Sequence, residues 1–142
     1  MKWVTREKPK VDRVACPGLI KNFIDPVAEL LFVPATDVMT IATDEMAIPY
    51  DVPDVGLSHH DGACSFEAIV ASYELDDPAI KLLAKIVRGA DTDDRGYMPQ
   101  SAGLRAISQG WHLLDWPTAR RLEVGFAVYD CLYAWCQAQV GA

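Results

Sequence analysis

The sequence predicts an α+β fold, in which a small, mainly parallel sheet in the N-terminal third precedes a largely helical C-terminal portion. In residues 2–53, short apolar segments alternate with helix-like segments in the order strand, helix, strand, helix, strand. Strands separated by helices usually return as right-handed parallel crossovers. Beyond residue 64, apolar residues recur mainly at helical spacing. The 142 residues suit one domain, so we expect residues 1–142 to form a single domain.

The first two elements are predicted from "KWVTR" and from the segment that follows it. Residues 2–6 form a short strand, and apolar residues from Val11 to Phe23 recur mostly at helical spacing. Pro17 fits a helix only in its first turn or at a kink. We therefore expect the helix to begin near Cys16.

The next three elements complete the predicted sheet. Residues 28–34, "AELLFVP", form a buried strand that Pro34 ends, and residues 35–47 form a helix. Residues 48–53, "IPYDVP", form a short extended piece that prolines interrupt.

Four helices are predicted in the rest of the chain. Each has a proline or an acidic residue near its start, and Gly89 is expected to close the second. Their ranges are residues 65–75, 77–90, 99–114 and 117–139.

The last of these helices carries a continuous apolar stripe. Its members repeat at four, three, four and three residues, which predicts a face turned toward the core. They are Leu122, Phe126, Tyr129, Tyr133 and Cys136, and Val128, Leu132 and Trp135 widen the stripe. A helix this apolar could bury a homodimer surface as well as a core.

Composition excludes several classes of function. The net charge is −7 with no basic run or stripe, which argues against direct binding of nucleic acid. The longest apolar stretches are far shorter than the roughly 20 residues of a membrane span, and the N-terminus lacks the apolar core of a signal peptide. The four cysteines lack CxxC spacing. We therefore expect a cytoplasmic protein with free thiols and no membrane partner.

The segment "GLSHHDGACSFEAI" is the densest in residues that can bind a metal. On one continuous helix His60, Cys64 and Glu67 would converge, but Gly62 favours a loop that leads into a helix. Glu67 also fits a capping box, and the histidines fit a solvated loop. A metal site and a capped helix both remain open on these residues alone.

Two further clusters bear on function. Asp91, in "RGADTDDRG", could add a hard oxygen ligand, although spacing alone does not bring it to His60. The segment "TREKPKVDRVACP" is basic in an otherwise acidic chain and could form an anion pocket or a solvated loop. Arg13, flanked by apolar residues, is its better candidate for a fixed role.

Five ordered motifs, spanning Lys2 to about Cys136, resemble the chromate-resistance protein family, specifically the domain found at the C-terminus of chromate-resistance regulators and also as a free-standing protein. They are "KWVTREKPKVDRVACPGLIKNFIDP", "YDVP", "HHDGACSFE", "IVRGADTD" and "LEVGFAVYDCLYAWC". One departure is Gly18, where the family commonly has tryptophan, which removes an aromatic wall or packing contact.

The resemblance implies a role in protection against chromate, and it implies metal ligation by His60, Glu67 and Asp91. His59 and Cys64 are reserve ligands. One nitrogen and two carboxylate oxygens, with water completing the shell, suit iron, manganese or zinc.

Three functions follow as expectations. The first is a cytoplasmic metal-binding protein that handles or senses chromate or its reactive oxygen by-products. The second is a non-enzymatic module that binds chromate or a related oxyanion through Arg13, Lys21 and Arg88. The third is a superoxide dismutase-like metalloenzyme, which some relatives are described as; it would need His59, His60 and His112 together.

Overall fold

A three-stranded parallel sheet and a set of helices make up the fold. The computed structural model describes residues 1–52, 65–92 and 98–141, without the side chains of Asp12 and Arg13. The strands are β1 (Lys2–Arg6), β2 (Glu29–Val33) and β3 (Ile48–Pro49), and the sheet order is β2-β1-β3. The helices are α1 (Asp12–Phe23), α2 (Val38–Asp44), which follows the 3-10 turn η1 (Ala35–Asp37), α3 (Ser65–Ser72), α4 (Pro78–Asp91), α5 (Pro99–Leu113) and α6 (Thr118–Val140). The predicted α+β class is confirmed.

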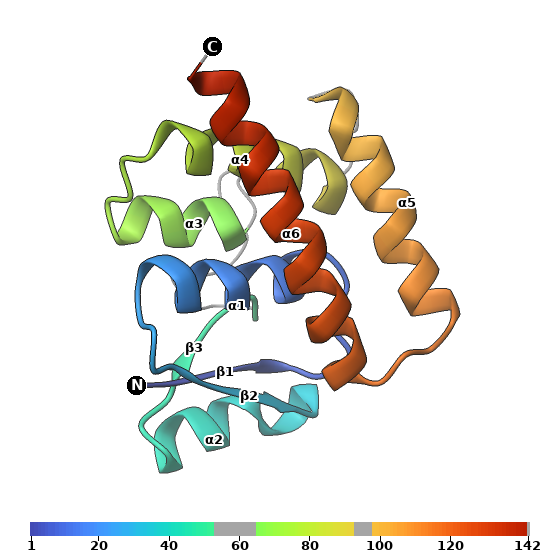
Figure 1. Cartoon of the computed structure of the whole chain (residues 1–142). Coiled ribbons are helices and arrows are strands. Elements are labelled where there is room, and N and C mark those ends of the chain that lie inside the picture. The colour runs from blue at the N-terminus through green and yellow to red at the C-terminus, as the bar shows by residue number, and fades with distance from the viewer. Residues whose placement is uncertain (53–64, 93–97, 142) are drawn as a thin grey trace.

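The sheet lies between α1 and α2, and the later helices pack beyond α1 (Figure 1). Successive side chains of a strand point to opposite faces, so alternate residues of β1 lie on the two faces of the sheet. Trp3 belongs to the large core with α1, whereas Val4 packs with Val38 of α2. The first third of the chain is thus a small βαβαβ unit whose sheet has α2 on one face and α1 on the other, and the later helices pack against α1.

The start of α1 differs from the prediction. The helix begins at Asp12 and contains Pro17, instead of beginning near Cys16. Two aromatic side chains fix the backbone just before it: the Trp111 indole donates to the carbonyl of Lys10 at 3.1 Å, and the Tyr129 hydroxyl donates to that of Val11 at 3.1 Å. These tertiary contacts hold the first turn in place despite the cost of a proline inside a helix.

Gly89 does not close α4, because the helix continues through it to Asp91. Gly89 is buried and its backbone is helical. The helix instead ends at Thr92, whose hydroxyl donates to the carbonyl of Arg88 at 2.7 Å.

The stripe predicted on α6 is only partly the buried one. Tyr129 and Cys136 are buried as expected, but in the first half of the helix the buried residues are Arg121 and Gly125. A Cβ atom added at Gly125 would lie 2.2 Å from Cγ1 of Val14, so α6 approaches α1 closely there. This close contact sets which face of α6 is buried, and it leaves the predicted Leu122, Phe126 and Tyr133 half-buried.

No helix in the described ranges is both long and apolar enough to cross a membrane.

Asp77 joins α4 to α6. One of its carboxylate oxygens caps α4 by accepting from the amide of Ala79 at 2.8 Å, and the other accepts from the Tyr133 hydroxyl at 2.5 Å. The hydrogen bond to Asp77, with a smaller contribution from burial, raises the pKa of Tyr133 to about 12. The neutral hydroxyl is therefore the form that stabilises this contact.

The pH dependence of stability should report this hydrogen bond. Tyr133→Phe keeps the ring contact with Phe23 but removes the donor. The pKa is higher in the folded protein, so the stabilisation is fully present below about pH 10, the ordinary tyrosine value, and is lost as the pH rises toward 12. In urea unfolding, we expect the difference in unfolding free energy between wild type and Tyr133→Phe to be constant near pH 8 and to shrink above about pH 10. A difference independent of pH would contradict this role.

Candidate functional site

The first turn of α3 and the last two turns of α4 bring two predicted site residues, Glu67 and Arg88, together. Oε1 of Glu67 lies 3.8 Å from Nε of Arg88, and both side chains are half-buried. Asp91 follows Arg88 by three residues on α4, a spacing that places two side chains on the same helix face. Arg88 thus has Glu67 as an ion-pair partner and Asp91 as a neighbour on its own helix.

A buried carboxylate lies where β3 ends. Asp51 has a positive φ of 49° and is only 4% exposed. Its Oδ1 accepts from the Ser65 hydroxyl at 2.9 Å, and its backbone carbonyl accepts from Nη2 of Arg6 at 3.1 Å. Asp51 therefore ties the carboxyl edge of the sheet to the first residue of α3, two positions before Glu67.

Asp51 was not among the predicted site residues. Its position in "YDVP", directly after the short third strand expected in a parallel sheet, could have identified it as a candidate site residue. The carboxyl ends of parallel strands are where such folds gather polar functional groups.

Several predicted site residues lie outside the described part of the chain. They are His59, His60 and Cys64, which fall in residues 53–64, and the side chain of Arg13. Within the described residues no group of three or more His, Cys, Asp or Glu side chains is placed to hold a metal ion. Ligation by His60, Glu67 and Asp91 stays a prediction.

The predicted oxyanion residues do not share one place. Lys21 is exposed in the last turn of α1, and it follows Arg13 by eight residues, about 12 Å along a helix axis. Arg88 belongs to α4 and pairs with Glu67. The helix geometry therefore separates Lys21 from the start of α1, where the basic segment ends.

Arg105 of α5 lies against the end of α4. Its Nη1 donates to the carbonyls of Ala90 at 3.0 Å and of Thr92 at 3.3 Å. These carbonyls lie at the C-terminal end of α4, where no further N–H group of the helix can donate to them. The Arg105 guanidinium therefore caps the C-terminal end of α4 beside Asp91. Arg105 belongs to α5 and lies outside the motifs from which the site residues were predicted.

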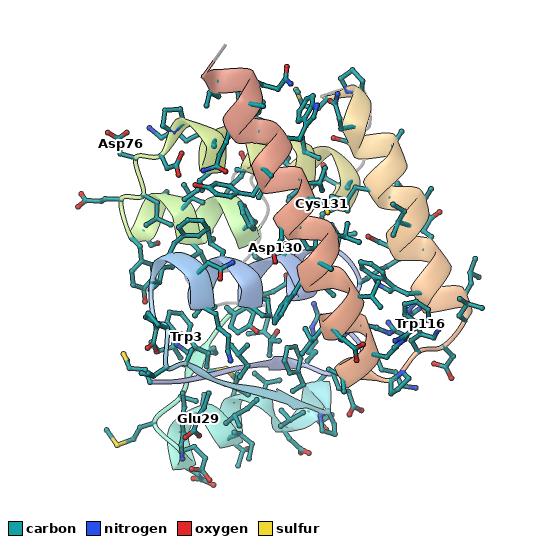
Figure 2. All side chains as sticks on the ribbon, in the orientation of Figure 1. Trp3, Glu29, Asp76, Trp116, Asp130 and Cys131 are labelled. Carbon is teal, nitrogen blue, oxygen red and sulfur yellow. The ribbon has the colours of Figure 1, made fainter. Side chains whose placement is uncertain are left out.

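A second arginine, Arg121, is fully buried at the start of α6. Its Nε donates to the carbonyl of Trp116 at 2.7 Å, on the connection between α5 and α6 (Figure 2). Its Nη1 donates to the carbonyls of Lys8 at 3.2 Å and Pro9 at 3.1 Å. Arg121 thus holds the segment between β1 and α1, which carries the basic residues of the predicted anion pocket.

His112 completes the surroundings of Arg121. Its Nδ1 lies 3.2 Å from Nη1 of Arg121 and must act as the acceptor, because a guanidinium has only donors. Burial lowers the pKa of Arg121, and the charge of Asp115, whose Oδ1 is 3.9 Å from Nη2, opposes that shift. His112 therefore accepts a hydrogen bond from Arg121 at the start of α6.

Comparison with known proteins gives one family and one curated relative. Residues 3–136 match the family described as "ChrB, C-terminal domain". Protein ChrB of Cupriavidus metallidurans is 36% identical over 134 residues, which cover 92% of this chain and 39% of that protein. The chain thus spans about two fifths of the length of this curated relative. No solved structure matches.

Proposed function

Because this chain belongs to the ChrB C-terminal domain family, we propose that it contributes to chromate resistance through a metal-assisted site at the junction of α3 and α4. Glu67 and Asp91 would each supply a carboxylate oxygen and His60 a nitrogen, with water completing the shell. This donor set suits iron, manganese or zinc. When bound, such an ion supplies an electrophilic centre with open positions for an oxygen species or an oxyanion.

The arrangement around Arg88 carries the proposal. Glu67 and Asp91 are half-buried carboxylates on neighbouring helices, and the Arg88 guanidinium, 3.8 Å from Glu67, offsets the charge of that carboxylate when no metal is bound. Nε of Arg88 lies 3.8 Å from Oε1 of Glu67, and a carboxylate has about four acceptor positions, so this ion pair alone does not exclude a metal from Glu67. Arg88 would also offer a cation to an oxyanion beside the metal.

The metal content of purified protein tests the proposal. We expect about one iron, manganese or zinc ion per chain, and we expect His60→Ala or Glu67→Gln to lower the metal affinity by about 10-fold or more. His112→Gln is the matched control, because His112 contacts Arg121 and should leave the metal in place. Elemental analysis, with circular dichroism to verify folding, gives the readout. Metal-free wild type with an intact fold after metal-replete growth would rule the proposal out.

A non-enzymatic oxyanion-binding module is the second candidate. Two cationic groups near the end of α4 favour it, namely Lys10 and the Nε and Nη2 groups of Arg105, which have no ion-pair or hydrogen-bond partner in the part of the chain that the structure describes. Such a module would bind chromate without a metal, so a chelator would leave its affinity unchanged.

A further inference from the structure

A small cavity opens where three segments meet: the end of α4, the middle of α5 and the residues before α1. Its volume is about 110 Å³, and its lining residues are Lys10, Val11, Ala90, Asp91 and Arg105. It therefore has room for a small ion, and it presents two cationic side chains and one carboxylate to that ion.

The cationic groups have unused donors. Both hydrogen bonds of Arg105 use Nη1, so among the described residues its Nε and Nη2 have no partner. The ammonium of Lys10 likewise has no ion-pair or hydrogen-bond partner within the described ranges. Both side chains are half-buried. Charged donors in such a setting form stronger hydrogen bonds to an anion than neutral donors do.

The wall of the cavity is held rigidly. The carbonyl of Lys10 accepts from the buried Trp111, and the carbonyl of Val11 accepts from the buried Tyr129. On the opposite wall, Arg105 is fixed by two carbonyls at the end of α4. A ligand would therefore cause little ordering of the protein, which favours binding.

Asp91 determines what kind of anion the cavity suits. A carboxylate repels a fully ionised oxyanion, but it accepts a hydrogen bond from an oxyanion that retains a proton. A carboxylate has about four acceptor positions, so other contacts of Asp91 leave room for this one. Lys10 and Arg105 supply the compensating charge.

We propose that this cavity binds a tetrahedral oxyanion that retains a proton, such as monohydrogen phosphate or hydrogen chromate, in preference to sulfate. Arg105 and Lys10 donate to the oxyanion oxygens, and Asp91 accepts from its hydroxyl. The site needs no metal, so it goes beyond the proposed metal-assisted function, although Asp91 belongs to both.

Calorimetric titration of the full chain near neutral pH, with a chelator present, tests the proposal. The probes are inorganic phosphate, chromate and sulfate. We expect phosphate and chromate to bind at least about 10-fold more tightly than sulfate, as expected for one charge-assisted hydrogen bond gained or lost. Lys10→Ala and Arg105→Ala should each weaken phosphate binding about 10-fold or more.

Two variants separate the site from the fold and from the metal. Within the described ranges the hydrogen bond of Lys10 uses its backbone carbonyl, so Lys10→Ala removes the ammonium and keeps that hydrogen bond. Lys85→Ala, on an exposed part of α4, is the matched control and should bind phosphate as wild type does. Asp91→Asn should reduce or reverse the preference for phosphate over sulfate.

Equal affinity for phosphate and sulfate, or unchanged binding in Lys10→Ala, would overturn the proposal. Failure of the metal-assisted function is a separate result. A wild-type chain that is metal-free after metal-replete growth, and that selects phosphate in the presence of chelator, would rule out the metal site and support this cavity.

Discussion

Replacement of Arg121 by methionine is expected to lower the free energy of unfolding by about 3–5 kcal/mol. Three carbonyls, of Lys8, Pro9 and Trp116, would lose their donor. A buried acceptor without a partner costs about 1–3 kcal/mol, and methionine fills the volume without replacing any of the hydrogen bonds. Urea unfolding followed by circular dichroism measures the loss.

The neighbouring arginine provides the control for this prediction. Arg120 is half exposed, pairs with Glu123 at 3.3 Å and lies over the Trp116 ring. Arg120→Met should change the unfolding free energy by about 1 kcal/mol or less, since exposed ion pairs and cation–π contacts are weak. If Arg121→Met cost no more than Arg120→Met, water would be able to satisfy the three carbonyls, and Arg121 would not be the residue that holds the segment before α1.

Replacement of Gly125 by alanine should destabilise the protein although alanine is the better helix former. The added Cβ would lie 2.2 Å from Cγ1 of the fully buried Val14. Overpacking of this kind typically costs about 1–3 kcal/mol. Thermal unfolding should show a lower midpoint for Gly125→Ala than for wild type.

Gly18→Ala is the matched control, because it makes the same change on the partner helix. Its Cβ would lie 3.7 Å from Phe126, an ordinary contact. There the gain in helix propensity should raise stability by about 0.5–1 kcal/mol. Gly125→Ala combined with Val14→Ala should be less destabilised than the sum of the two single variants, as expected for residues in contact. If Gly125→Ala stabilised the protein as Gly18→Ala does, the close approach of α1 and α6 would be disproved.

Periodicity predicted most of the fold because the sheet and its helices follow local rules. The strand at residues 2–6 and the helix at 117–139 both have apolar repeats that match their observed elements closely. The predicted start of α1 was wrong, and so was the predicted buried face in the first half of α6, because distant contacts decide both. Trp111 and Tyr129 fix the first, and the packing of Gly125 on Val14 fixes the second.

The candidate site was predictable only in part. Glu67, Arg88 and Asp91 were predicted from motifs; Glu67 and Arg88 form an ion pair between α3 and α4, and Asp91 follows Arg88 by three residues on α4. Arg105 was not singled out, because its contact with the end of α4 comes from another helix. Arg121 was overlooked for a different reason: a charged residue in an amphipathic helix is normally assigned to the exposed face, and only long-range carbonyls make its burial favourable.

The donors that hold the segment before α1 come from far along the chain. The contact of Trp111 with Lys10 spans 101 residues, that of Arg121 with Pro9 spans 112, and that of Tyr129 with Val11 spans 118. During synthesis the first strand and helix therefore leave the ribosome long before their partners exist. Contacts so distant in sequence slow folding and leave apolar surface exposed meanwhile. Helix α6 thus completes the packing of α1, and the native core forms only after α6 has been synthesised.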